Sequence, residues 1–395
     1  MAATTAETRF RAEARDWLES ALPGGWGSER RVSGELATRI AEGRAWQRKL
    51  YEGGWAALGW PEEYGGRPAT ATERLIFAEE TARLRAPEPA DIFGLYILGP
   101  TLLAIGSEEH RRRFLPPIVR GETMWCETFS EPGAGSDMAN VQTRARRDGD
   151  ELVISGRKRW NSLAQFADWT MLLCRTGPPE SRTRGISFLL VDLSTPGVGV
   201  EQLPMMTGDA RETEVFFDDA RVPVENVVGE IDAGWQVVMT AMTIQRSIGT
   251  AELVPRLSAV VDDLVELARE TRRGGRPALE DQLVRDRLAR CRIEVDALRR
   301  SGERTLAAAA AGRTPGPEVS TAKLFWSELD QRLRRTAIEL AGLRGQLTRH
   351  DPGAPDGGVW SHYFLWSHAL TIHSGTSEIQ RNILAERVLG LPRAR

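Results

Sequence analysis

The spacing of hydrophobic residues changes twice along the chain. In roughly the first 120 residues, apolar positions such as Leu75, Ile76 and Leu84 recur at intervals that line one face of a helix. A turn rich in Gly and Pro, GWPEEYGG, interrupts this helical pattern. The helices predicted for this part cover Thr8–Leu22, Leu36–Leu58, Thr70–Leu84 and Gly106–Arg120.

Between residues 124 and 226 the apolar runs become short and rich in β-branched and aromatic residues, with Gly and Pro between them. Strands are predicted at Leu152–Ser155, Trp169–Cys174, Ile186–Val191 and Thr213–Phe217. Several short strands at close spacing favour a barrel or sandwich over alternating βαβ units. No Gly-x-Gly-x-x-Gly follows a strand and no Walker P-loop is present, so a Rossmann domain is not expected.

After residue 234 the helical pattern returns in longer segments, separated by short breaks at 313–317 and 350–358. Long helices with short connections favour an antiparallel bundle, and the run Ala307–Ala311 favours close helix packing. The predicted fold is α+β and multidomain, with an N-terminal helical domain (1–122), a middle β-barrel or sandwich domain (123–233) and a C-terminal helical bundle (234–395). The predicted helices here are Trp235–Arg269, Glu280–Ala311, Pro317–Leu343, Gly358–Thr371 and Ser377–Leu389.

Composition narrows the class of protein. Of 395 residues, 41% are hydrophobic and 27% charged, which is typical of a globular protein and not of a disordered or disulfide-rich one. The 52 basic and 55 acidic residues nearly balance, so nucleic acid is not an expected partner. Three scattered cysteines and five unclustered histidines predict no metal site, and no apolar run is long enough to span a membrane. With no secretory signal at the start of the sequence, we expect a cytoplasmic protein.

Three motifs carry a resemblance to a known family. They are WCETFSEPGAGSD at 125–137, KRWNS at 158–162 and GTSEIQR at 375–381. Together with the helix–strand–helix order, they resemble the acyl-CoA dehydrogenase flavoproteins. GWPEEYGG and the final ILAERVLGLPR fit the same family. The resemblance implies FAD and the oxidation of an acyl thioester to its trans-2-enoyl form, with hydride transfer from Cβ to flavin N5.

The resemblance also assigns residues on the strand side of the flavin. Ser130 matches a family Thr whose hydroxyl donates to the flavin pyrimidine edge, and the backbone amides of Glu127 and Phe129 are expected to help. Donors are needed there because the reduced flavin gathers negative charge. Gly133 and Gly135 allow the backbone to approach a ligand closely, although a simple strand-connecting turn remains the alternative.

Three further residues match family contacts in this part of the chain. Trp160 matches an aromatic residue beside the flavin, and Ser162 matches a hydroxyl that bonds near N5. A tryptophan in a strand can also be core. Ser136 matches a contact to CoA, with a turn-stabilising hydroxyl as the other interpretation.

In the family the dinucleotide site spans two subunits, and the C-terminal region supplies the rest of it. Thr376 and Glu378 match residues on the adenosine and ribose side of FAD. The loop that contains Glu339 and Gly342 matches one that reaches the FAD of a neighbouring subunit, with Glu339 where Gln is usual. The family's Arg-x-x-Phe-Gly turn is poorly preserved in this sequence. Arg272 is expected to replace its pyrophosphate-binding arginine, with a solvated basic loop as the alternative interpretation, and Gln282 is expected to contact FAD as well.

The catalytic base of the family is missing from both of its usual positions. One position is Ser374, directly before GTS, and the other is Gln245, directly before Arg246. An amide has no useful proton affinity near neutral pH, and a serine needs a base of its own. The Ser374 backbone amide can still bind the thioester carbonyl, and Arg246 can position the substrate. His373 is a weaker candidate base, since its side chain need not face the substrate.

Several explanations of the missing base remain open. Another carboxylate, such as Glu214 or Asp137, can act as the base, or a homologous partner subunit can carry it. Gln245 can be a Glu-to-Gln replacement made to trap substrate, or the scaffold can perform a different flavin oxidation. A flavin-binding protein without catalysis is the alternative outside enzymes. The expected partners are an acyl thioester of CoA or of a carrier protein, an electron acceptor such as an electron-transfer flavoprotein, and further subunits in a homodimer, tetramer or heteromer.

Overall fold

The computed structural model describes residues 4–22, 35–310, 316–317 and 319–393, without the side chains of 246–253, 306 and 308–310. The chain forms two compact units, each assembled from separate segments. We call residues 34–69 and 87–245 the sheet unit, and residues 1–33, 70–86 and 246–395 the helical unit.

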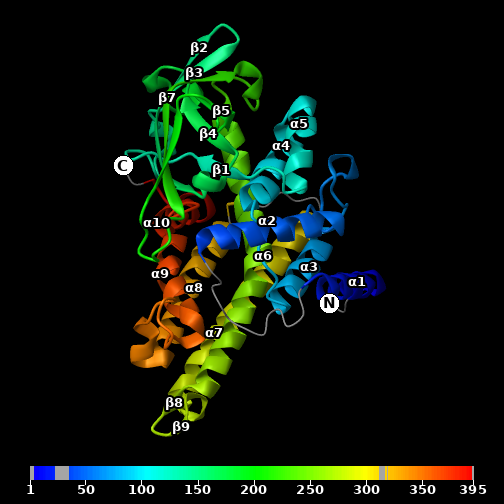
Figure 1. The fold of residues 1–395 in the computed structure, drawn as a ribbon, viewed down its shortest axis with the longest axis vertical. Coiled ribbons are helices and arrows are strands. Elements are labelled where there is room, and N and C mark those ends of the chain that lie inside the picture. The colour runs from blue at the N-terminus through cyan, green and yellow to red at the C-terminus, as the bar shows by residue number, and fades with distance from the viewer. Residues whose placement is uncertain (1–3, 23–34, 311–315, 318, 394–395) are drawn as a thin grey trace. The chain divides into compact units, whose positions relative to one another are not determined.

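The centre of the sheet unit is one seven-stranded sheet with the order β1-β4-β2-β3-β7-β6, in which β5 pairs with β4 (Figure 1). β1 runs parallel to β4, whereas β3 and β7 form the longest antiparallel pair. One face buries a core that includes Cys126, Leu172 and Val215. The strands are β1 (Trp125–Thr128), β2 (Arg144–Asp148), β3 (Glu151–Ser162), β4 (Trp169–Arg175), β5 (Ile186–Asp192), β6 (Val198–Gln202) and β7 (Glu212–Pro223).

Three α-helices lie wholly within the sheet unit: α2 (Leu36–Glu52), α4 (Gly99–Ile105) and α5 (Glu108–Val119). The helix predicted for 36–58 ends at Glu52, because Gly53 and Gly54 follow and Gly54 has a φ of 74°. Buried Gln47 on α2 donates to the carbonyl of Ile118 and accepts from the amide of Asp91, which ties these segments together. The short α4, which follows a π-helical turn, was not predicted.

The helical unit is a bundle around one core that includes Leu264, Leu298 and Leu333. Glu80 fixes two of its N-terminal helices: burial alone raises its pKa, but hydrogen bonds from Arg15, Arg83 and Arg11 outweigh it and lower the pKa to about 2. The elements are α1 (Thr5–Ala21), α3 (Ala71–Arg83), α6 (Gly234–Glu270, which begins in the sheet unit), β8 (Arg272–Arg273), β9 (Arg276–Pro277), α7 (Gln282–Ala310), α8 (Val319–Ala341), α9 (Val359–Leu370) and α10 (Ser377–Ile383).

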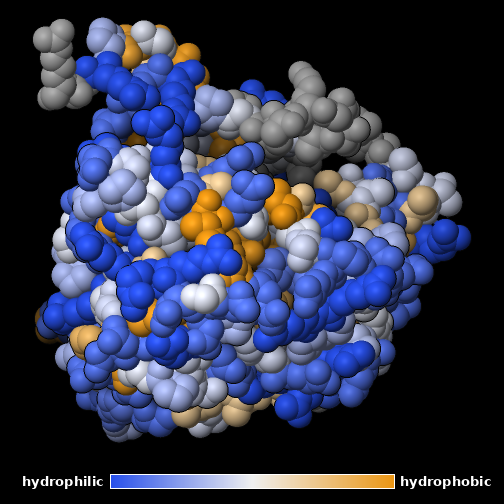
Figure 2. Space-filling model, turned by 90° about the horizontal axis from the view of Figure 1, so that it is seen from above, coloured by the Kyte–Doolittle hydropathy of each residue, from blue (hydrophilic) through white to orange (hydrophobic). Residues whose placement is uncertain are grey.

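The predicted order of helices, then strands, then a helical bundle is confirmed. Most element ends differ by one to three residues, but the ends of α2, β3, β7 and α10 differ by six or seven. Among the described residues, no helix has the length and hydrophobicity needed to cross a membrane, and no group of three or more His, Cys, Asp or Glu side chains could hold a metal ion. The face in Figure 2 is mostly hydrophilic, with hydrophobic residues in small groups.

Candidate functional site

The first two motifs meet in the sheet unit, where β3 lies beside β1 and the turn after it. The ammonium of Lys158 is fully buried and contacts Glu131 Oε1 at 2.8 Å and the carbonyl of Phe129 at 3.1 Å. The backbone amide of Arg159 donates to the carbonyl of Ser130 at 3.0 Å. These contacts join WCETFSEPGAGSD to KRWNS. We call the region around Glu127, Phe129, Ser130, Trp160 and Ser162 the strand site.

Glu131 is the anchor of the turn. Its two oxygens accept the backbone amides of Gln142 and Thr143 as well as the Lys158 ammonium. Burial raises its pKa, but the neighbouring Lys158 charge and these hydrogen bonds outweigh it and hold the pKa below the ordinary value. The SEPGAG turn is therefore fixed by buried electrostatic contacts and not only by its glycines.

Trp160 lies at a β-bulge. Arg159 pairs with Glu214 and Asn161 pairs with Thr213, so Trp160 is the extra residue between two regular pairs. Its φ is 67°, a left-handed conformation that is rare for a bulky residue. The bulge turns the indole outward, leaving it 54% exposed instead of buried in the core. An exposed indole held by backbone geometry is suited to a flat ligand.

Polar atoms without protein partners gather in the strand site. Glu127 Oε1 and Asn161 Oδ1 are buried and have no hydrogen-bond partner among the described residues. Burial raises the pKa of Glu127 to about 8, so its carboxyl group tends to be protonated at neutral pH. The Asn161 side-chain amide instead donates to the carbonyl of Glu127 at 3.0 Å. Only the backbone amide of Glu127 was expected to contact the flavin. Its side chain was not identified, because the motif does not show that this side chain is buried.

The turn beyond the strand site is open. No protein atom lies within 4 Å of where a side chain would begin at Gly133 or Gly135. Ser136 and Asp137 are exposed, and Asp137 lies 3.4 Å from Arg182. The backbone here is therefore free for a ligand to approach.

Ser162 is engaged within the sheet. Its hydroxyl donates to Glu212 Oε1 at 2.8 Å, and the two residues are direct partners on β3 and β7. Glu212 is only 7% exposed. Sequence reasoning did not identify Glu212, because nothing in its motif shows that it lies opposite Ser162.

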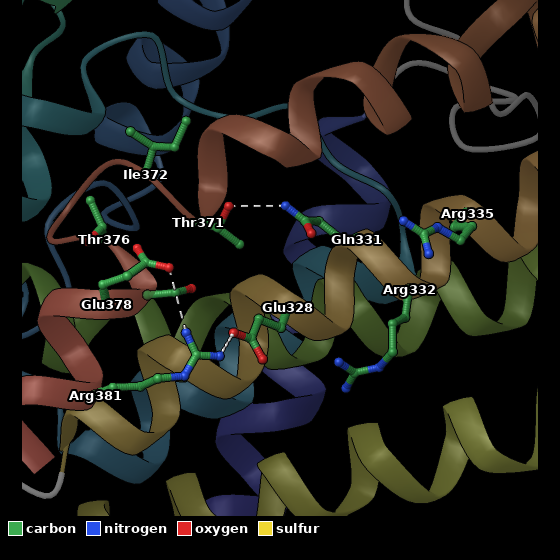
Figure 3. Close-up of a pocket in the computed structure, with 10 residues that line it drawn as sticks. Glu328, Gln331, Arg332, Arg335, Thr371, Ile372, Thr376, Glu378 and Arg381 are labelled. Atoms are coloured by element: carbon green, nitrogen blue, oxygen red, sulfur yellow. Dashed lines mark hydrogen bonds and ion pairs between the residues drawn. The ribbon is translucent and has the colours of Figure 1, made fainter. Parts of the chain in front are cut away.

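The helical unit contains a polar cavity of about 570 Å³ at the third motif, which we call the helix pocket (Figure 3). Arg381 contacts Glu328 at 2.5 Å and Glu378 at 3.8 Å. Thr376 and Glu378, both expected FAD contacts, lie on its wall. The lining residues are Glu328, Gln331, Arg332, Arg335, Thr371, Ile372, Thr376, Ser377, Glu378 and Arg381.

The turn before α10 shapes the wall of the helix pocket. Ser374 has a φ of 56°, and its hydroxyl lies 3.1 Å from Nδ1 of His373. The Thr376 hydroxyl accepts the amide of Ile379 at 3.2 Å and so caps α10. The pKa of the exposed Glu378 carboxyl is lowered by hydrogen bonds from its own backbone amide and from the Thr376 hydroxyl.

The remaining expected FAD contacts form a second group in the helical unit. Arg273, next to Arg272, donates to the carbonyl of Glu339 at 2.8 Å, and Arg287 forms an ion pair with the Glu339 carboxylate. Gln282 begins α7, and Gly342 follows α8 with a φ of 60°. Glu328 and Glu339 are eleven residues apart on α8, so this group lies roughly 16 Å along that helix from the helix pocket. The structure therefore does not bring the two sets of contacts together in one place.

The family base positions remain without a carboxylate. Gln245 lies on α6, and its Oε1 is buried with no partner among the described residues. The side chain of Arg246 lies outside the described residues. Glu214, considered as a substitute, is held by both Arg157 and Arg159. Both carboxylate oxygens of Glu214 therefore lie in ion pairs.

Comparisons with known proteins agree along the whole chain. Family models match residues 4–122 (acyl-CoA dehydrogenase, N-terminal domain), 126–220 (middle domain) and 232–389 (C-terminal domain). Acyl-CoA dehydrogenase IpdE1 of Mycobacterium tuberculosis is 41% identical over 97% of both chains. Among solved structures, the ChsE4-ChsE5 complex from M. tuberculosis has a TM-score of 0.85 with 32% identity and covers 100% of both chains. The Tcur3481-Tcur3483 steroid ACAD also has a TM-score of 0.85, with 31% identity, and covers 100% of this chain and 99% of its own.

The residues present fit the FAD that this family uses. The strand site offers an exposed indole, two hydroxyls and buried polar atoms that have no partner in the described part of the chain, which suit the flat flavin ring with its donor and acceptor edge. The helix pocket offers three arginines that suit the phosphates of FAD. It also offers hydroxyl and carboxylate groups that suit the ribose. On the full-length family matches and these features, the chain belongs to the acyl-CoA dehydrogenase family of FAD-dependent oxidoreductases.

Proposed function

We propose that this chain binds FAD, to which the strand site and the helix pocket each contribute contacts, and that it acts as one subunit of a heteromeric acyl-CoA dehydrogenase. A homologous partner chain would supply the catalytic base. The observation that carries the proposal is the absence of a carboxylate at both Gln245 and Ser374 in a chain that keeps its flavin motifs. Two similar solved structures, the ChsE4-ChsE5 complex and the Tcur3481-Tcur3483 steroid ACAD, support it because each is named for two chains.

In the reaction, FAD supplies the hydride acceptor, and the residues of this chain bind and orient. Trp160 packs against the flavin, while Ser130 and Ser162 offer their hydroxyls to its edge. Ser136 and Arg246 contact the substrate, and the backbone amide of Ser374 polarises the thioester carbonyl. Arg272, Gln282, Glu339 and Gly342 act toward FAD at a subunit boundary, as in the family.

The three sequence domains, with boundaries at 122 and 233, remain our proposal for the functional division of the chain. CoA is the proposed thioester carrier, with a steroid-derived acyl group suggested by the name of the steroid ACAD. An electron-transfer flavoprotein is the proposed acceptor of electrons. The cytoplasm is the proposed location, which suits three free cysteines.

Anaerobic reduction of the bound flavin tests the proposal. We expect the purified chain alone to keep its oxidised flavin spectrum when mixed with a straight-chain or a steroid-derived acyl-CoA. Gln245→Glu should reduce its flavin about 10²–10⁴-fold faster, because it places a general base at the family position without changing side-chain size. Gln236→Glu, which adds a carboxylate at an exposed position of the same helix, should give no gain. Ser374→Glu tests the other base position.

Rapid flavin reduction by the unmodified chain alone would contradict the need for a partner. Glu127 is then the second candidate base, because its Oε1 has no partner among the described residues and a pKa of about 8 lies near the operating pH, where the ionised fraction is a stronger base than an ordinary carboxylate. In that case Glu127→Gln should abolish the reduction. If Gln245→Glu gains nothing while acyl-CoA still perturbs the flavin spectrum, the helix position is not the ancestral base.

A further inference from the structure

A buried carboxyl group holds the hydroxyl expected to face the reactive edge of the flavin. Ser162 and Glu212 stand directly opposite each other on β3 and β7, and the hydroxyl lies 2.8 Å from Glu212 Oε1. The bulge at Trp160 sets this register, since it shifts every later pairing of β3 by one residue. The contact is therefore built into the same backbone feature that exposes the indole.

The protonation state of Glu212 decides what the Ser162 hydroxyl can offer to a ligand. A serine hydroxyl has one proton to donate and lone pairs to accept with. If Glu212 is ionised, it accepts a hydrogen bond from the Ser162 hydroxyl, so Ser162 can only accept a hydrogen bond from the ligand. If Glu212 is protonated, it can donate to Ser162 and leave the serine proton free for the ligand. Flavin N5 is an acceptor in oxidised FAD and a donor in reduced FAD, so the two arrangements favour different oxidation states.

Glu212 is suited to gaining and losing its proton at a pH above the range in which a glutamic acid ordinarily titrates. Burial raises its pKa, while the Ser162 hydrogen bond and the charge of Arg211 oppose this. Other charged groups near its position on β7 and the neighbouring segments are paired: Arg39 holds Asp209 at 2.6 Å, and Arg159 holds Glu214 at 2.9 Å. On β6, the exposed Glu201 stands opposite Glu214 and not Glu212.

We propose that Glu212 is a positioning residue that couples its own protonation to the oxidation state of FAD through the Ser162 hydroxyl. This rests on the proposed placement of Ser162 at the flavin, but not on the identity of the thioester or on which chain carries the base. The family resemblance assigns no role to this position.

The test is the midpoint potential of the bound flavin as a function of pH, measured by dye equilibration with dithionite and without any acyl-CoA. The protein is used as the FAD-loaded assembly in which it purifies. The potential is measured over about pH 5–9, a range that lies above the ordinary pKa of a glutamic acid. We expect a change of slope in the unmodified protein that is lost in Glu212→Gln. Ser162→Ala should lose it too, and Ser162→Thr, which keeps the hydroxyl, should retain it.

Two controls separate this coupling from other effects. Glu201→Gln removes an exposed carboxylate from the same sheet and should leave the change of slope intact. In Ser162→Ala, Glu212 still titrates, so a change of slope that persists there would mean a direct effect of charge and would overturn the proposal. A slope unaffected by Glu212→Gln would overturn it as well. If Glu212→Gln does not retain FAD, the Ser162 pair of variants decides. Because dithionite supplies the electrons, failure of acyl-CoA to reduce the flavin is a separate result that bears only on the proposed function.

Discussion

The strand site and the helix pocket hold their charges in opposite ways. In the strand site, Lys158 is fully buried and makes two hydrogen bonds, and Glu131 is nearly buried and accepts three. In the helix pocket, the side chains of Arg381 and Glu378 are 52% and 77% exposed. Separating a buried pair leaves each charge buried without its counter-ion, which costs several kcal/mol, whereas exposed pairs are weak and exchange easily. The strand site is therefore fixed before a ligand arrives, and the helix pocket can give its charges to one.

The largest effect is expected from breaking the buried pair. Lys158→Met should lower the free energy of unfolding by about 3–5 kcal/mol, because it leaves the Glu131 carboxylate buried without its cation. Chemical denaturation measures this loss. Arg221→Met removes a partner from exposed pairs with Asp148 and Glu151 and should cost no more than ~1 kcal/mol. Equal losses in the two variants would remove the contrast between buried and exposed pairs.

Glu127→Gln should change how stability depends on pH. The folded pKa of about 8 lies above the ordinary value of 4.5, so the unfolded chain loses its proton first and stability falls as pH rises between these values. We expect the amide to remove on the order of 2 kcal/mol of this fall, allowing for the partial exposure of the residue. Thermal unfolding of the FAD-free protein at pH 5 and pH 8 gives the comparison. Parallel curves for the two proteins would mean that Glu127 ionises normally.

Arg381→Gln should weaken FAD binding about tenfold, or ~1.4 kcal/mol, with stability nearly unchanged. The reason is that an exposed arginine contributes little to folding but can release its carboxylates and bind a phosphate. Fluorescence titration with FAD measures the affinity. Arg290→Gln is the matched control, because this arginine forms an exposed pair with Asp286 on α7 and does not line the helix pocket. A large loss of stability in Arg381→Gln would show that the pocket is rigid instead.

The smallest effect concerns Thr376, which caps α10 and is also a proposed FAD contact. Thr376→Ala should destabilise the protein by ~1 kcal/mol through loss of the cap. Thr376→Ser keeps a hydroxyl and should restore both stability and FAD affinity. If the serine variant restores stability but not affinity, the methyl group of Thr376 contributes to binding in its own right.

The sequence predicted the features that depend on local patterns. The order of elements follows from hydrophobic spacing, which is local, and the motifs identified Ser130, Trp160 and Thr376 by type and position. The end of α2 was placed too late because the hydrophobic pattern continues through Trp55 and Leu58 beyond the glycines that stop the helix.

What could not be predicted depends on which residues face each other. Glu212 is fifty positions from Ser162, and only the register of β3 against β7 brings them together. The buried state of the Glu127 carboxyl likewise depends on strands distant in sequence. Pairings of this kind are set by tertiary structure, which a single sequence does not reveal.

The bulge at Trp160 constrains how this protein can evolve. One extra residue, Trp160, sets the parity of the end of β3. Deleting it would restore a regular ladder with Asn161 and Ser162 still opposite Thr213 and Glu212, but would remove the left-handed position that turns the indole outward. Point substitutions at Ser162 or Glu212 preserve that parity and can alter the chemistry of the site one group at a time. Diversification at this edge should therefore proceed by substitution, while insertions and deletions accumulate in the loops.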